Sequence, residues 1–317
     1  MNYSGILAIR IVGAIGLGVC ALFSVVFPSG PTIVNESQNG TGLSRAPTDH
    51  KSNRCKQCEN EPALAPVGSG KVQQLDPELT AAQRTLQHKV ELLQRGRAFL
   101  LKVPTYTAKL SKQEVVKGEL LDEQTISLKC RHSPFSVYLT WLSGDVGREV
   151  IYVEGANDGK LTAHDGGWKS RLPAFSLSPD SWLAMRDARY PVTAAGVLAL
   201  IDIMDGIHAD DLARSKVASC ELTVDHFDGR PCHTFTTLYK NREVSPIYRK
   251  SVTMIDQEWN VPLSSRHFEW PKAEGTVPEN QLDEATLIES YAFTELAFDA
   301  PLADRDFDTS NPEYQFR

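Results

Sequence analysis

The sequence predicts an α+β fold in which one large, curved antiparallel sheet is wrapped on a few helices. Apolar residues recur at helical spacing in two segments, at about residues 77–102 and 193–206. Most residues beyond 104 alternate between apolar and polar side chains with the period of two that is typical of strands. Because helices and strands do not alternate along the chain, a doubly wound parallel sheet is not expected.

An uncharged, apolar stretch at residues 11–27 predicts an N-terminal apolar helix and export of the chain beyond it. Arg10 precedes the stretch and the next basic residue is Arg45, so the N-terminus is expected to stay in the cytoplasm. Residues 1–30 would be a cleaved signal peptide or a signal-anchor helix in the cytoplasmic membrane, and lipidation at Cys20 is a third alternative. The expected location is the cell envelope, with a periplasmic domain that is either anchored in the inner membrane or secreted after cleavage.

Residues 31–75 are rich in Pro, Gly, Ser and Asn with few large apolar residues, which predicts a disordered linker. The linker holds Cys55 and Cys58. No strand is predicted before this pair, so a thioredoxin-like redox centre is not favoured; a local disulfide and half of a shared metal site both stay open. A single domain with a short C-terminal tail is expected over residues 76–317.

Local signals predict the elements of this domain. Asp76 and Pro77 are typical of an N-cap and a first helical position, and this helix must end before Pro104. A second helix is expected after Thr193, ending near Gly206. The remaining predicted elements are strands over about 104–164, an irregular proline-containing segment over 170–192, and hairpins over 216–298.

An expected hairpin turn at Asp228-Gly229 predicts which residues lie opposite two cysteines. If these residues form a two-residue turn, Cys220 lies opposite Thr237 and Cys232 lies opposite Asp225. The two cysteines are then too far out of register for a disulfide. We therefore expect free, buried thiols.

Charge and motifs argue against nucleic acids and nucleotides as partners. The formal net charge is −7, from 33 basic and 40 acidic residues, and no basic stripe with interleaved aromatic residues occurs. Glycine-rich phosphate-binding loops are missing from the sequence.

No sequence motif indicates an enzyme, because the nucleophile elbow and the His-Glu-x-x-His motif are both missing. Two local clusters combine histidine with carboxylates: His164 with Asp165, and His208 with Asp210 and Asp211. The second is expected to be solvated, just beyond a helix end. Neither cluster has the further ligands of a metal site, so no metal or cofactor is expected. A hydrolase that uses His164, Asp165 and a distant acid such as Glu149 is a lesser alternative.

The predicted sheet has an apolar face that could line a cavity. With only two predicted helices, a sheet of this size is expected to be incompletely covered, and a partly filled concave face makes an apolar pocket. An ordinary core packed against the helices is the competing interpretation. The candidate lining residues are Phe135, Val137, Leu139, Trp141, Val150 and Tyr152.

The residues also carry a family resemblance. The run over 106–167, which includes "PFSVYLTWLSGDVGREVIYVEG", and the closing "YAFTELAFDAPLADRDFDTSNPEYQF" resemble an uncharacterised bacterial envelope family, domain of unknown function 1571, over about 75–317. More weakly, Lys129, Tyr152 to Gly155 and Tyr291 to Leu296 stand where the periplasmic lipoprotein-carrier (outer-membrane lipoprotein-sorting) superfamily has comparable features. The resemblance implies a half-barrel of about eleven antiparallel strands, filled by helices, that binds acyl chains or lipidated proteins without enzyme activity. It assigns no binding residues.

The expected function is therefore binding or sensing of a lipid or lipoprotein, by an exported and membrane-tethered protein that is not an enzyme. The tether would be residues 11–27 in the cytoplasmic membrane, and no nucleic acid is involved. An envelope scaffold or interaction module with a filled core is the main alternative.

Overall fold

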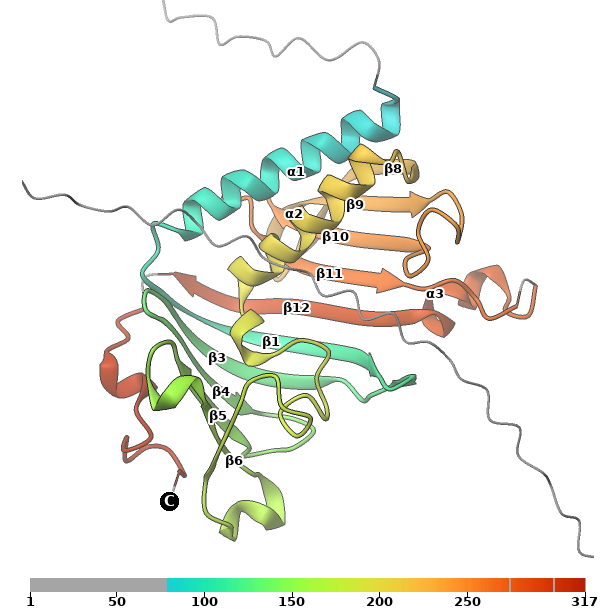
Figure 1. Cartoon of the computed structure of the whole chain (residues 1–317). Coiled ribbons are helices and arrows are strands. Elements are labelled where there is room, and N and C mark those ends of the chain that lie inside the picture. The colour runs from blue at the N-terminus through green and yellow to red at the C-terminus, as the bar shows by residue number, and fades with distance from the viewer. Residues whose placement is uncertain (1–78, 274, 299, 317) are drawn as a thin grey trace, which may run out of the picture. The chain divides into compact units, whose positions relative to one another are not determined.

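The computed structural model describes residues 79–273, 275–298 and 300–316. Two long helices, α1 (Ala81–Leu100) and α2 (Val197–Ala213), lie on one side of a 12-stranded antiparallel sheet, as Figure 1 shows. The strands are β1 (Thr105–Val116), β2 (Glu119–Leu120), β3 (Gln124–His132), β4 (Phe135–Trp141), β5 (Glu149–Val153), β6 (Leu161–His164), β7 (Phe175–Leu177), β8 (Val217–Phe227), β9 (Arg230–Tyr239), β10 (Lys250–Asp256), β11 (Pro262–Phe268) and β12 (Leu287–Phe298). The predicted α+β fold class, with a large antiparallel sheet and few helices, is confirmed.

The sheet is open, with β7 and β8 at its two edges. Its strand order is β7-β6-β5-β4-β3-β1-β12-β11-β10-β9-β8, and β2 pairs only with β1. Neighbours along this path are mostly neighbours in sequence. The exception is the centre, where the first strand pairs with the last and Leu110 lies opposite Phe293.

Helix α1 packs one apolar face onto the sheet, and Leu86, Leu93 and Leu100 are completely buried. It begins later than predicted. Thr80 is the N-cap: its hydroxyl accepts a hydrogen bond from the Gln83 amide, and the Gln83 side chain accepts one from the Thr80 amide. This capping box is the stronger start signal. The predicted start at Asp76 and Pro77 lies outside the described residues.

Helix α2 continues beyond its predicted end, so the expectation that His208 and Asp211 are solvated is wrong. Both side chains lie inside the helix and are 1% and 2% exposed. They follow Met204 at intervals of four and three residues, on the helix face that meets the sheet. Gly206 is tolerated within the helix because it lies on the exposed face.

The β8–β9 hairpin has the predicted register. Asp228 and Gly229 both adopt positive φ, at 50° and 73°, as a two-residue turn requires. Cys220 pairs with Thr237, and Cys232 pairs with Asp225. Both thiols are buried and free, as is Cys130.

Different parts of the chain cover the two faces of the sheet. On the inner face, α1 and α2 lie over the half formed by β8–β11, and the irregular segment 165–196, which includes the edge strand β7, lies over the half formed by β1 and β3–β6 (Figure 1). On the outer face, the C-terminal tail over 300–316 packs against β4 and β5. There the rings of Tyr138 and Tyr314 stack with centroids 4.0 Å apart.

The predicted N-terminal segments lie outside the described residues. These are the signal or anchor over 1–30 with Cys20, and the linker over 31–75 with Cys55 and Cys58. The predicted division of the chain into these segments and one domain therefore stays a prediction. Among the helices of residues 79–316, none combines the length and apolar character needed to cross a membrane.

Candidate functional site

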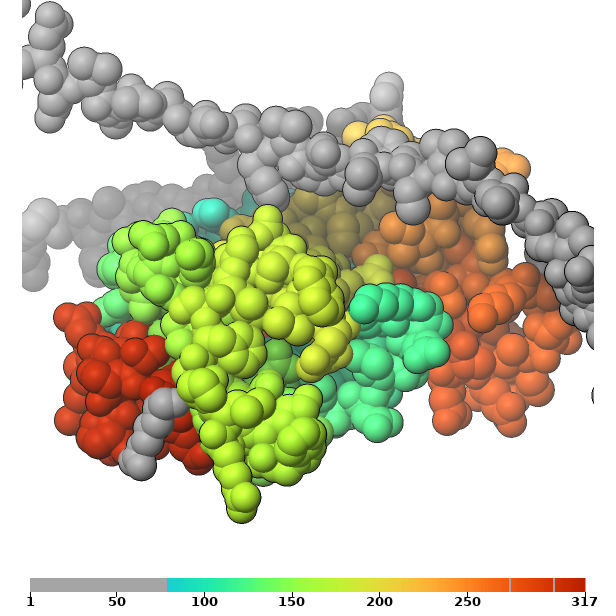
Figure 2. Space-filling model, turned by 60° about the horizontal axis from the view of Figure 1, so that its bottom comes forward, coloured from blue at the N-terminus to red at the C-terminus, as the bar shows by residue number. Residues whose placement is uncertain are grey.

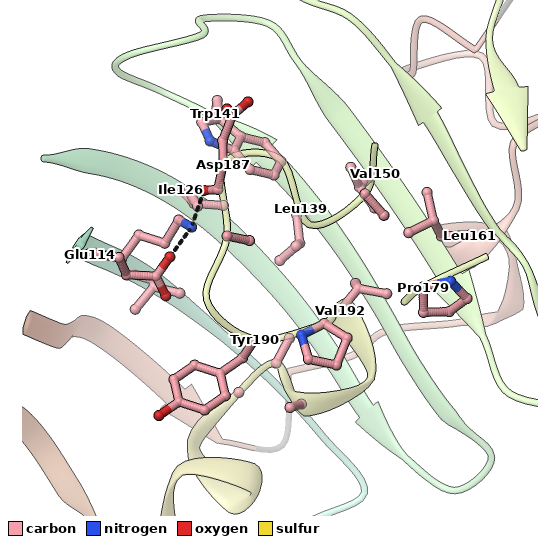
Figure 3. A pocket seen from close by; sticks show the side chains of 18 of the residues that line it. Glu114, Ile126, Leu139, Trp141, Val150, Leu161, Pro179, Asp187, Tyr190 and Val192 are labelled. Atoms are coloured by element: carbon pink, nitrogen blue, oxygen red, sulfur yellow. Dashed lines mark hydrogen bonds and ion pairs between the residues drawn. The ribbon is translucent and has the colours of Figure 1, made fainter. Parts of the chain in front are cut away.

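A cavity of about 390 Å³ lies between the inner face of the sheet and the irregular segment 165–196. Its floor is formed by β1, β3, β4, β5 and β6, and α2 and β12 close one side. Its volume falls within the range of about 300–1,000 Å³ typical of small-molecule sites. Figure 3 shows it from close by.

Most of the cavity wall is apolar because alternate residues of neighbouring strands point to the same face. Leu139 lies between Leu128 and Val150 in the paired strands, and Trp141 lies opposite Ile126. The segment 165–196 adds side chains on the side of the cavity opposite the sheet. The apolar lining residues are Leu110, Ile126, Leu139, Trp141, Val150, Leu161, Ala163, Phe175, Leu177, Pro179, Leu183, Ala184, Ala188, Pro191, Val192, Ala194, Ala195, Leu200, Ile203, Met204 and Phe293.

Three of the six lining residues predicted from the sequence, Leu139, Trp141 and Val150, border the cavity. The other three lie farther along the same face of β4 and β5. Val137 is completely buried in the core, and the rings of Phe135 and Tyr152 lie 6.1 Å apart, outside the cavity lining. That any of the six contacts a ligand stays a prediction.

A polar wall faces the apolar lining of the cavity. Glu114 of β1 lies at one end of this wall. Its Oε2 accepts hydrogen bonds from Lys112 Nζ at 3.0 Å and the Arg189 amide at 3.1 Å, and its Oε1 accepts one from the Tyr291 hydroxyl at 2.6 Å. Burial and the neighbouring carboxylates raise the pKa of Tyr291, so its hydroxyl stays a donor. In Figure 3, Glu114 and Tyr190 lie across the cavity from Val150 and Leu161.

Glu289 of β12 is the second carboxylate of this wall and is 1% exposed. Its oxygens lie 3.0 Å from Arg189 Nε and 3.0 Å from His267 Nδ1, and accept hydrogen bonds from the hydroxyls of Tyr190 and Tyr248, both at 3.2 Å. Burial alone would raise the pKa of Glu289, but these partners together lower it. The carboxylate is therefore held ionised and fixed in place.

Charged residues stand at the more exposed side of the cavity. Arg148 lies 3.8 Å from Asp187, which also forms an ion pair with Arg186 at 2.8 Å. The Arg148 guanidinium covers the ring of Trp141 at 4.6 Å. Burial would raise the pKa of Asp187, but the nearby cations Arg186, Arg148 and Lys112 lower it. The cavity is thus amphipathic, with paired charges on one side only.

The residues of the hydrolase alternative lie in different surroundings. Asp165 lines the cavity, whereas Glu149 and His164, although paired across β5 and β6, lie on the outer face near the tail. Both Glu149 oxygens are occupied, by the Tyr138 hydroxyl at 2.8 Å and the Gln315 amide at 2.7 Å. The geometry does not join His164 and Asp165 in one reactive group.

Within the described part of the chain, no group of three or more His, Cys, Asp or Glu side chains could hold a metal ion. Sequence reasoning did not identify Glu114, Glu289, His267 or Tyr190 as lining residues. The signal available was the continuation of the inner-face alternation in β1, where Lys112 and Glu114 follow Leu110. Polar residues on a buried face predict a site or a buried network.

The model of the DUF1571 family of proteins of unknown function matches residues 103–316. The chain belongs to this family. No curated protein matches it. The family membership expected from the sequence is thereby confirmed.

Several solved structures are also similar to this chain. Lipoprotein LppX of Mycobacterium tuberculosis is 11% identical, over 70% of this chain and 99% of that chain, with a TM-score of 0.39. MucB is 14% identical over 70% of this chain, which spans only 62% of MucB, with a TM-score of 0.39. A LolA superfamily protein from Nitrosomonas europaea is 10% identical, over 69% and 96% of the two chains, with a TM-score of 0.20. At such scores the likenesses carry no weight for function.

Proposed function

We propose that this protein binds a lipid, or the acyl chain of a lipidated protein, in the cavity under segment 165–196 and does not alter it chemically. The observation that carries the proposal is the amphipathic cavity of about 390 Å³. Its apolar floor suits a hydrocarbon chain, and its wall of fixed charges suits a polar group attached to that chain. An envelope scaffold with a completely filled core would not contain such a cavity.

The apolar half of the cavity favours an acyl chain over a small polar ligand. Leu139, Val150 and Leu161 offer a hydrocarbon chain no hydrogen bonds and gain from burial of its surface, at about 25 cal/mol per Å². The carboxylates of Glu114 and Glu289 are already satisfied by protein donors. They hold the shape of the polar wall and leave apolar burial as the main source of affinity.

The test is uptake of a fluorescent fatty acid by the purified full chain, with native mass spectrometry to detect amphiphiles that copurify. Ala163→Leu places three further carbon atoms at the cavity floor, and we expect uptake to fall at least tenfold. Thr162→Leu is the matched control, because the preceding residue of β6 points to the opposite face. No bound amphiphile and no uptake by the unmodified chain would refute the proposal.

For the location of the protein we infer export, with residues 11–27 as signal or membrane tether. The support is the uncharged length of this segment and the lack of basic residues between Arg10 and Arg45. Mass spectrometry of the intact chain from its native cells tests this inference. A mass that includes residues 1–30, together with recovery in the membrane fraction, indicates an anchor, and recovery in the cytosol contradicts export.

A further inference from the structure

The loops around the cavity expose an unusual group of large apolar side chains. Eleven large hydrophobic residues are exposed among those that the structure describes, and five belong to these loops. They include two tryptophans, Trp168 at 83% and Trp182 at 77% exposure. We call these five residues the rim surface: Leu142, Val146, Trp168, Leu172 and Trp182.

One contact between the loops joins two parts of the rim surface, and the third part lies beside the same cavity. The Gly167 amide donates a hydrogen bond to the Val146 carbonyl at 3.0 Å, so the loop before β5 touches the loop after β6 just before Trp168. Trp182 lies between Pro179 and Leu183, which line the cavity. Farther along the same segment, Asp187 lies 3.8 Å from Arg148, which follows the loop of Val146.

The segment 165–196 therefore presents apolar side chains on both of its sides. Phe175, Leu177 and Leu183 point into the cavity, whereas Trp168 and Trp182 contribute nothing to the core. Each tryptophan can bury about 150–250 Å² of surface when a partner covers it. Figure 2 shows the yellow-green atoms of this part of the chain at the front of the molecule. An apolar group of this kind beside a cavity marks an interaction surface.

The charges around Trp168 indicate what covers the rim surface. Lys169 and Arg171 form no ion pair within the described residues, and Lys169 Nζ lies 5.8 Å from the Trp168 ring. Near Trp182, the exposed carboxylate of Asp180 carries the opposite charge to these two cations. Tryptophan beside lysine and arginine is the combination enriched where proteins meet the boundary between membrane and water, because the ring sits at headgroup level and the cations meet anionic lipids.

We propose that the rim surface docks on a lipid bilayer, with Trp168 and Trp182 inserted at the level of the headgroups. Docking brings the cavity to the bilayer, so that an acyl chain moves between the two with little exposure to water. The transfer of an acyl chain between bilayer and cavity rests on the proposed function. The docking itself depends only on the exposed side chains of the rim.

Tryptophan fluorescence tests the proposal in the full chain. The chain is reconstituted into vesicles of phosphatidylethanolamine and phosphatidylglycerol, with or without phosphatidylcholine brominated on its acyl chains. No tryptophan precedes Trp141 in the sequence, so residues 11–27 give no signal. Because two of the five tryptophans belong to the rim surface, brominated lipid is expected to remove up to about two fifths of the emission.

Two double variants assign the quenching. Trp168→Phe with Trp182→Phe is expected to lose the rim component, whereas the matched control Trp259→Phe with Trp270→Phe keeps it. Trp141 lines the cavity and would respond to brominated lipid bound inside. It is present in both variants, so the difference between them reports the rim alone. Lys169→Glu with Arg171→Glu is expected to reduce quenching on anionic vesicles.

The outcomes separate this proposal from the proposed function. Equal emission in brominated and ordinary vesicles would overturn docking on lipid and leave a protein as the partner of the rim. The same loss of emission in the two double variants would overturn it as well, because the rim would then contribute nothing. Quenching at the rim without uptake of fatty acid would support docking and refute the proposed function. Uptake of fatty acid without quenching at the rim would support the proposed function and refute docking.

Discussion

The two halves of the inner face are covered in different ways, and only one is filled. Over β8–β11, α1 and α2 bring side chains to the sheet at every turn, and residues such as Ile201 and Phe235 are completely buried. Over β1 and β3–β6, the irregular segment 165–196 spans the sheet and leaves the cavity. A regular helix repeats its contacts along its length, whereas a segment with three prolines and short turns touches the sheet at intervals. The kind of segment that covers the sheet therefore decides where this fold leaves a cavity.

Truncation of a leucine in each half is expected to show the largest contrast. Leu93→Ala in α1 should lower the free energy of unfolding by about 2–5 kcal/mol, because a cavity forms in a filled region. Leu177→Ala in β7 borders space that already exists and should cost only about 1 kcal/mol. Urea unfolding followed by circular dichroism measures both. Equal losses would show that the cavity half is as tightly packed as the helical half.

The buried Lys89 predicts a pH effect confined to the filled half. Burial lowers its pKa from 10.5 to about 8, against smaller opposing effects of Cys220 and Asp211, and its Nζ has no hydrogen-bond partner among the described residues. Because the pKa in the folded state is the lower one, protonation favours the unfolded chain. The resulting destabilisation, about 3 kcal/mol, is complete below pH 8 and is relieved as the pH rises toward 10.5.

Lys89→Met removes this titrating group. We expect the variant to be more stable than the unmodified chain at pH 7, with the gap closing as the pH approaches 10. Chemical unfolding at several pH values measures the difference. Lys102→Met is the control, since this exposed side chain should change stability by less than about 0.5 kcal/mol. A variant that is less stable at pH 7 would contradict the interpretation.

Two helical glycines should give the smallest effects, of opposite sign. A Cβ at Gly96 of α1 would overlap the Asn260 carbonyl oxygen and lie 2.7 Å from its carbon, so Gly96→Ala should cost about 1–3 kcal/mol. A Cβ at Gly206 of α2 meets nothing within 4 Å, and Gly206→Ala should stabilise by about 0.5–1 kcal/mol. Thermal unfolding measures both. Stabilisation by Gly96→Ala would show that α1 can move away from the sheet.

The sequence was sufficient for features that depend on local signals. The Asp228-Gly229 turn determined the register of a whole hairpin, including the separation of Cys220 from Cys232. The alternation in β4 and β5 placed Leu139, Trp141 and Val150 on one face. The family resemblance implied about eleven strands, and eleven lie on the continuous path of the sheet.

Features that depend on distant pairings were not predictable. Glu114, His267 and Glu289 meet because β1, β11 and β12 are neighbours in the sheet, which no local pattern reveals. For the same reason, the alternation of side chains along β4 places Leu139 and Val137 on the same face but does not show that Leu139 borders the cavity and Val137 lies in the filled core. The predicted end of α2 near Gly206 is wrong because a glycine is only a local stop signal, whereas His208 and Asp211 are buried when the helix continues past it.

The pairing of β1 with β12 has a consequence for how the protein is made. The first and last strands of the domain lie side by side at the centre of the sheet, so each half has an unpaired edge until β12 is present. Contacts between residues so far apart in sequence form slowly, because a long loop must close first. A chain that emerges from a ribosome or a translocation channel in order must therefore hold two incomplete sheets apart until its final strand inserts between them.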